Sequence, residues 1–129
     1  MSKEPVQTMI VLTTAKHDRG TRATLAFSWG CAALAMGQTV AIYLTMDGTV
    51  WATQGATRGV AVSGFEPLES YVDQFLALGG ELLVCAPCCE YYCSLDDLQP
   101  GEKLREGISL VGLATVVSRI GANTKVITF

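Results

Sequence analysis

The chain has 129 residues, enough for one domain that buries a core without disulfides or metals, so we expect a single domain over residues 1–129. The net charge is −3 and no run of Lys and Arg occurs, which argues against nucleic acid as a partner. Half of the residues are hydrophobic and only 16% are charged, against roughly 25% in typical soluble domains, and this balance favours a homo-oligomer.

The N-terminus, M-S-K-E-P-V-Q, lacks the charged and then apolar pattern of a signal peptide, so we expect a cytoplasmic protein. The uncharged segment over residues 23–38 is interrupted by Ser28, Gly30 and Gly37. It is too short to span a bilayer, so we expect no stable membrane insertion. Because the cytoplasm is reducing, clustered cysteines there are more often catalytic, redox-active or metal-bound than structural.

The first half of the chain predicts a strand, a helix and a second strand. Residues 6–14 are rich in β-branched side chains and almost wholly apolar, which is typical of a strand buried on both faces. Residues 23–36 leave almost no polar face and predict a helix, with Thr21 or Thr24 as its cap and a glycine at its end. The second predicted strand covers residues 38–46 and closes with an Asp-Gly turn.

The second half begins with a long connection over residues 47–66, a feature that more often serves as a lid, a binding loop or a subunit contact. A helix follows from Pro67, with apolar side chains at helical spacing, and a Gly-Gly pair ends it. Strands are predicted at residues 81–85, 108–111 and 125–129, and a polar loop at residues 96–106. A last helix precedes the closing strand and carries one apolar stripe, Leu113, Val116, Val117 and Ile120.

Strands that alternate with helices, most of them apolar throughout, predict an α/β three-layer sandwich. We expect a mostly parallel five-stranded sheet with helices on both faces, in a flavodoxin-like arrangement. In open α/β sheets functional groups gather beyond the carboxyl ends of the strands. The loop with His17 and Arg19, the turn with Asp47, and Cys85 all follow strands, so we expect them at one edge of the sheet.

Four of the five cysteines fall in the segment V-C-A-P-C-C-E-Y-Y-C, residues 84–93. Cys85 ends a predicted strand, and Pro87 suits the first turn of a helix whose free N–H groups point back toward the thiol. A helix N-terminus lowers a cysteine pKa from about 8.5 to roughly 3.5–7.5, which favours the nucleophilic thiolate. At about 100° per residue, Cys89 and Cys93 share a helix face and Cys88 points elsewhere. A bent first turn would let Cys93 approach Cys85.

Two metal sites fit this spacing poorly, and a dithiol site fits it in part. A structural zinc takes a second ligand pair from a distant segment, which Cys31 and His17 do not form. The bacterial iron–sulfur run is not matched either, so we expect no metal and no cofactor. Cys85-Ala86-Pro87-Cys88 is similar to the thioredoxin motif, and thiol-disulfide exchange is the alternative function, although the motif comes late in the chain.

The chain resembles the DsrE/DsrF-like sulfur-relay family, which includes TusD, along nearly its whole length. The resemblance rests on V-A-I-Y-L-T-M-D-G, on the helix L-E-S-Y-V-D-Q-F-L-A-L-G-G, and above all on L-L-V-C-A-P-C. It implies a parallel α/β fold, trimers or hexamers, and a cysteine, here Cys85, that accepts sulfane sulfur and passes it to a TusA-like carrier. Further cysteines of sulfur-oxidation members map onto Cys88 and Cys93. Basic residues that often follow the cysteine in tRNA-thiolation members are replaced here by E-Y-Y-C, so sulfur oxidation or general sulfane trafficking is the closer match.

The chemistry of the residues agrees with a sulfur carrier or sulfurtransferase. Sulfane transfer needs a thiolate that holds a persulfide or thiosulfonate, and a second thiol that can attack it. We assign Cys85 as the acceptor, Cys93 as the better candidate for the second thiol and Cys88 as the next. Cys31 lies inside an apolar helix, where a thiol simply packs. The sequence names neither donor nor acceptor, and does not decide between carrier and enzyme.

Other polar and aromatic residues carry weaker expectations. His17 and Arg19 could favour the thiolate or hold an anionic donor such as thiosulfate, but a solvated turn is the favoured interpretation. Trp51 and Arg58 could line a pocket or a neighbouring subunit, with no ranking between the two. We expect the two tyrosines before Cys93 to pack against the helix layer or a subunit interface, because a phenol with a pKa near 10 has little to do in sulfur transfer.

Overall fold

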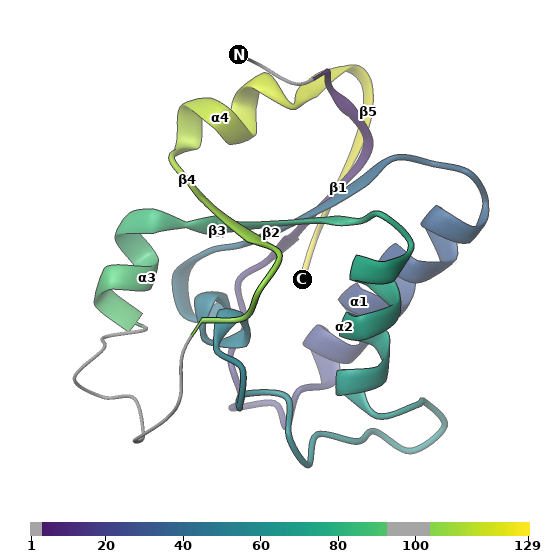
Figure 1. Ribbon diagram of the computed structural model, residues 1–129, viewed down its shortest axis with the longest axis vertical. Helices are drawn as coiled ribbons and strands as arrows, with labels where there is room; N and C mark the ends of the chain where they lie inside the picture. The colour runs from purple at the N-terminus through teal and green to yellow at the C-terminus, as the bar shows by residue number, and fades with distance from the viewer. Residues whose placement is uncertain (1–3, 93–103) are drawn as a thin grey trace.

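One parallel β-sheet organises the protein, which is described by a computed structural model over residues 4–92 and 104–129. The strands are β1 (Val6–Leu12), β2 (Val40–Leu44), β3 (Glu81–Cys85), β4 (Ile108–Val111) and β5 (Ile120–Thr128). They lie in the order β4-β3-β2-β1-β5, and each neighbouring pair is parallel (Figure 1). The predicted α/β fold with a parallel five-stranded sheet is confirmed.

Helices lie on both faces of this sheet. The helices α1 (Thr21–Ala35) and α2 (Leu68–Ala77) pack side by side on one face (Figure 1). The 3-10 helix η1 (Met46–Ala52) contributes Trp51 and Ala52 to the same core cluster and contacts α3. The short helix α4 (Leu113–Ser118) lies on the opposite face, where Val116 shares a core cluster with Val6 and Met9. The helix α3 (Ala86–Tyr92) follows β3 directly, at the carboxyl end of the sheet.

The central strand β2 shows why the sequences of the predicted strands are continuous apolar runs. All five of its residues are buried, because helices cover both of its faces and strands flank both of its edges. Ile42 and Leu44 belong to the core beneath α1 and α2, whereas Ala41 and Tyr43 belong to the core of the other face. Cys85 of β3 lies in that second core as well.

The start of α1 differs from the sequence-based prediction. Gly20, not Thr21 or Thr24, occupies the cap, in the left-handed region at φ 79°. The carboxylate of Asp18 accepts hydrogen bonds from the backbone N–H groups of Gly20 and Arg22, both at 3.0 Å. A carboxylate satisfies helix N–H groups and also favours the positive end of the helix dipole, so the loop aspartate outcompetes the two threonines. The predicted end of the helix at a glycine is confirmed, since Gly37 has φ 87°.

The long connection after β2 is pinned to the core at two places. Trp51 on η1 is fully buried and its indole N–H donates to the carbonyl of Thr14 at 2.8 Å, so it lines neither a pocket nor a subunit surface. Arg105 is buried farther along and donates to Thr57 Oγ1 at 3.0 Å and to Glu69 at 3.2 Å. A buried charge with a paired carboxylate ties the connection to α2.

The second face of the sheet is more thinly covered than the first. The predicted apolar stripe on the last helix is wrong, because α4 ends at Ser118 and Ile120 already belongs to β5. Only Val116 of that stripe is buried, while Leu113 is 67% exposed and Val117 is 64% exposed. Within the two described segments, no helix has the length and apolar content needed to cross a membrane.

Candidate functional site

Cys85 lies where β3 passes into α3. The β2–β3 register pairs Leu44 with Val84, so the next residue on each chain segment, Thr45 and Cys85, lie beside each other. On the other side, Cys85 is paired with Val111 of β4. The Cys85 side chain is only 7% exposed. The surroundings of its sulfur come from β2, β3 and the first turn of α3.

Cys88 approaches the same place from α3. Its Sγ lies 3.6 Å from the hydroxyl oxygen of Thr45 and 4.0 Å from the thioether sulfur of Met46. Its thiol and its backbone N–H both hydrogen-bond to Cys85. The N–H belongs to the first helical turn, where backbone donors lack partners within the helix. Two thiols, a hydroxyl and a thioether thus meet at one strand end.

These contacts set the acidity of Cys85. Burial is the largest influence and raises the pKa of the thiol, but it is outweighed by the donors around the sulfur, which are the Cys88 thiol, the Tyr43 hydroxyl, the Cys88 N–H and the Thr45 hydroxyl. The pKa of Cys85 therefore lies below its ordinary value, because these donors stabilise the thiolate more than burial penalises it. A low pKa on a thiol at a strand end is the condition for nucleophilic chemistry.

Tyr43 is the residue of this site that sequence reasoning missed. It lies on β2, is 3% exposed, and directs its hydroxyl at Cys85, although the geometry falls short of a full hydrogen bond. Burial and the neighbouring Cys85 raise the pKa of Tyr43 to about 12. A signal was available, since Tyr43 is the one side chain with a polar tip in the otherwise aliphatic strand V-A-I-Y-L that precedes the Asp47 turn.

The other cysteines are distributed over different surroundings. Cys89 belongs to the core beneath α1 and α2, so α3 directs it away from the face that holds Cys85 and Cys88. Cys93 lies outside the described residues, so its place as second thiol stays a prediction. Cys31 packs inside α1, donates to the carbonyl of Tyr71 at 3.3 Å, and has its pKa raised by burial. No disulfide links any cysteine of residues 4–92.

The polar loop after β1 does not join this cluster. His17, Arg19 and Arg58 are exposed, and the described contacts of Cys85 and Cys88 come instead from β2 and the turn that follows it. The solvated turn that we favoured for the His17 loop agrees with its exposure. Among residues 4–92 and 104–129, no three His, Cys, Asp or Glu side chains form a group that could hold a metal ion.

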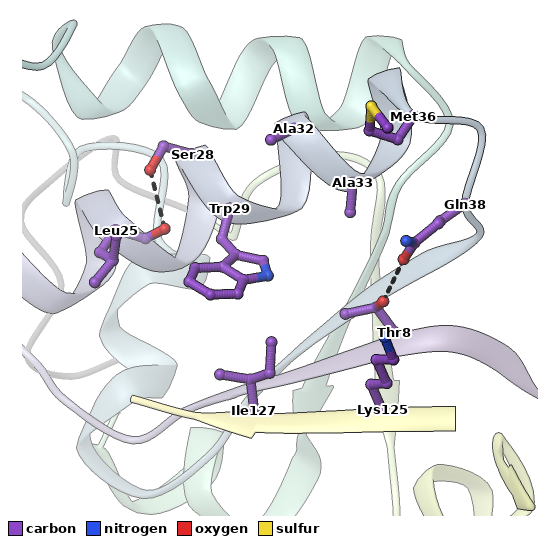
Figure 2. A pocket seen from close by; sticks show the side chains of 10 residues that line it. All are labelled: Thr8, Leu25, Ser28, Trp29, Ala32, Ala33, Met36, Gln38, Lys125 and Ile127. Atoms are coloured by element: carbon purple, nitrogen blue, oxygen red, sulfur yellow. Dashed lines mark hydrogen bonds between the residues drawn. The ribbon is translucent and has the colours of Figure 1, made fainter. Parts of the chain in front are cut away.

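A cavity of about 520 Å³ lies away from the cysteines, between α1 and β5. Figure 2 shows the indole of Trp29 pointing from α1 toward Ile127 on β5, with the hydroxyl of Thr8 donating to Gln38 at 2.5 Å along one side. Its walls are mostly apolar and it contains no thiol, carboxylate or histidine, so it carries none of the chemistry found at Cys85. Its lining comprises Thr8, Leu25, Ser28, Trp29, Ala32, Ala33, Met36, Gln38, Lys125 and Ile127.

Comparisons with known proteins agree with this architecture. The sequence matches the DsrE/DsrF-like family over residues 7–129. The YchN protein of Escherichia coli has a similar structure, with a TM-score of 0.70 at 16% identity, and each chain covers 100% of the other. A conserved protein of unknown function from Bacteroides thetaiotaomicron gives a TM-score of 0.60 at 12% identity, with 95% of each chain covered. At these identities the two structures show the fold alone. The comparison with curated proteins gives no match.

Proposed function

The chain belongs to the DsrE/DsrF-like family, which indicates a role in sulfur relay, and from that premise we propose a sulfur carrier or sulfurtransferase that accepts sulfane sulfur on Cys85. The observation that carries this proposal is the position of the Cys85 thiol at the end of β3, where Cys88 of α3 and Thr45 lie beside it, and these neighbours also lower the pKa of the thiol. A thiol in that position is disposed toward the nucleophilic thiolate, whereas Cys31 and Cys89 are buried in the opposite core.

The loading step is a displacement at sulfur. The Cys85 thiolate attacks the outer sulfur of a donor persulfide R–S–SH, a new S–S bond forms on Cys85, and the donor S–S bond breaks to release R–S⁻. The product is Cys85–S–SH. With tetrathionate as donor, the same attack leaves a thiosulfonate on Cys85 and releases thiosulfate. No net oxidation or reduction is needed in either case, because a sulfane sulfur only changes its partner.

Unloading follows one of two routes that differ in the sulfur attacked. An acceptor thiolate that attacks the outer sulfur takes it away as a new persulfide and regenerates the Cys85 thiolate. A thiol within the protein that attacks the inner sulfur instead forms a disulfide with Cys85 and releases hydrosulfide. The contact of Cys88 with Cys85 supports Cys88 as the attacking thiol of this second route, and Cys93 remains a proposed second thiol.

We propose a TusA-like carrier protein as the exchange partner, in cytoplasmic sulfur oxidation or sulfane trafficking. The exposed edge formed by α3 and the turn after β2 supports this, since Met46 and Tyr91 offer apolar surface close to the thiols. Mixing the loaded protein with a TusA-like acceptor should move a mass of one sulfur atom from Cys85 to the acceptor. A loaded protein that never transfers sulfur to such an acceptor would refute the TusA-like carrier as the exchange partner.

Mass spectrometry tests the acceptor itself. Reduced protein exposed to polysulfide, thiosulfate or tetrathionate should gain sulfur on Cys85, and peptide mapping should locate it there. Cys85→Ser should abolish the gain, whereas the matched control Cys31→Ser should load as wild type does, since its thiol is packed in α1. If Cys85→Ser loads as well as wild type, the proposed function is wrong.

Thiol-disulfide exchange remains a second candidate because Cys85 and Cys88 are in hydrogen-bond contact. A dithiol oxidoreductase would reduce protein disulfides with turnover, and it would need both thiols equally. A sulfur carrier would keep loading on Cys85 after Cys88→Ser. Insulin reduction measured beside sulfur loading on the Cys88→Ser variant separates the two functions.

We also propose that the protein works as a homo-oligomer, a trimer or a hexamer. The thinly covered second face supports this, because Leu113 and Val117 of α4 expose apolar side chains to solvent next to Val126 of β5, which is also exposed. Sedimentation velocity should give a mass of three or six chains. A Leu113→Glu, Val117→Glu variant should dissociate, since charges at such an interface are unpaired. A monomeric wild type would refute this assembly.

A further inference from the structure

The hydroxyl of Tyr43 makes no standard hydrogen bond to the described part of the fold. The side chain is 3% exposed, and its oxygen is buried without a hydrogen bond of standard geometry to any described group. Buried polar groups are nearly always paired, so an unpaired one needs an explanation. The ring of a phenylalanine would fill the same space, so packing does not explain the hydroxyl. We therefore look for a hydrogen bond that this hydroxyl makes in another state of the site.

The surroundings of this hydroxyl consist of reacting groups and apolar side chains. The titratable groups that face it are Cys85 from β3 and Cys88 from α3, and the hydroxyl of Thr45 completes the set. From α4, Val116 packs in the same cluster and brings no charge. The largest influences on Tyr43 include no carboxylate and no cation of the described residues. Its proton therefore stays on the oxygen across the cellular pH range, which leaves a neutral donor aimed at sulfur.

We propose that Tyr43 donates a hydrogen bond to the sulfur carried by Cys85, and so stabilises both the attacking thiolate and the anionic persulfide that forms on it. This inference rests on the proposed function and names a further residue of the same site. The new S–S bond adds one sulfur beyond Sγ and moves the negative charge onto that outer atom. A donor held rigidly by the central strand is already in place when the charge arrives, so no reorganisation is needed.

Because the Tyr43 hydroxyl lacks a full hydrogen bond when Cys85 carries no extra sulfur, it should favour the loaded form of the protein. A donor that is unsatisfied before loading and satisfied after it favours the loaded state over the empty one. Cys88 and Thr45 already contact each other at 3.6 Å, whereas the Tyr43 hydroxyl makes no hydrogen bond of standard geometry to a described group. The Tyr43 hydroxyl is thus the donor of this cluster that can form a new hydrogen bond to an incoming sulfur atom.

The test compares Tyr43→Phe with the matched control Tyr71→Phe, whose hydroxyl instead accepts from the backbone N–H of Glu66 at 3.2 Å. The first measurement is the alkylation rate of Cys85 against pH in the reduced, unloaded protein, with peptide mapping to assign the site. Tyr43→Phe should move the profile of Cys85 to higher pH and slow alkylation at neutral pH about tenfold, the size expected for a lost hydrogen bond to a charged group. Tyr71→Phe should leave the profile unchanged.

A second measurement follows the loaded state. At a fixed polysulfide concentration, the equilibrium constant for loading should fall about tenfold in Tyr43→Phe. Replacing Tyr43 with 3-fluorotyrosine, a stronger donor, should move both results in the opposite direction, which a purely structural role would not do. A Tyr43→Phe protein with the wild-type pH profile and loading constant overturns the proposal.

Failure of the proposed function gives a different pattern. A wild-type protein that takes up no sulfur on Cys85 refutes the sulfur carrier, and with it the persulfide half of this inference. The alkylation profile does not depend on loading, so it still decides whether Tyr43 donates to the thiolate. An unchanged profile refutes that half on its own.

Discussion

The stability of the protein in alkali offers a sharp test of the buried Tyr43. Its pKa is raised to about 12 from an ordinary 10.0, by burial and by the neighbouring Cys85. A phenol with a raised pKa favours the folded state while it is protonated. That stabilisation is complete below the unfolded pKa near 10 and is lost as the pH rises through the folded value, so the free energy of unfolding should fall in this window. At about 1.36 kcal/mol per pKa unit, the loss attributable to Tyr43 should be about 1.3 kcal/mol between about pH 9 and 11.

The assay is urea unfolding of wild type and Tyr43→Phe at closely spaced pH values across this range. The variant should equal or exceed wild type in stability at pH 8, because the lost hydroxyl had no full hydrogen bond. Its advantage should then grow by about 1.3 kcal/mol by about pH 11, since a phenylalanine has nothing to ionise. The contribution of Cys85, whose pKa differs between the two proteins, is calculated from its alkylation profile and subtracted, and the other titrating groups cancel in the difference. If the difference in unfolding free energy between the two proteins stays constant with pH, the pKa of Tyr43 is not raised in the folded state, and the reasoning is refuted.

Two further predictions concern neighbouring residues. Cys88→Ala removes the hydrogen bond that contributes most to lowering the pKa of Cys85, so the alkylation profile of Cys85 should shift to higher pH. Cys89→Ala is the control, because Cys89 is the next residue but lies in the opposite core, and it should leave the profile unchanged. Equal profiles for the two variants would contradict this. Gly80→Ala places a Cβ 2.4 Å from the ring of Phe75, so unfolding should become easier by about 1–3 kcal/mol, with sulfur loading per folded molecule unaffected. A variant as stable as wild type in urea would show that the ring can move aside.

Strong periodicity made most of the fold predictable from the sequence. Residues 81–85 form a strand as predicted, because an apolar run bounded by a Gly-Gly pair and a proline leaves little choice. The closing strand is longer than predicted, since β5 begins at Ile120. Its exposed edge tolerates polar residues that weaken the apolar pattern. The same mixed pattern made the helix before it look longer and more buried than α4 is.

The candidate site was only partly predictable, for a physical reason. Position at a strand end and a following helix identified Cys85, because both features are local in sequence. Which groups face its sulfur depends on the register between β2 and β3, which brings Tyr43 and Thr45 across from another strand. Register is a tertiary property, and no spacing within the cysteine segment encodes it. For the same reason the split between Cys88 and Cys89 became clear only once α3 was placed against two separate cores.

The pairing of β1 with β5 has a consequence for how the chain is made. β1 is completed on one edge by β2, which soon follows it, but on the other edge by β5, with Ile10 opposite Ile127. A nascent chain therefore carries an unpaired, apolar strand edge until β5 has been synthesised, and such long-range pairing slows folding. Open edges recruit other chains, so slow translation or loss of the last strand should drive aggregation before any thiol chemistry begins.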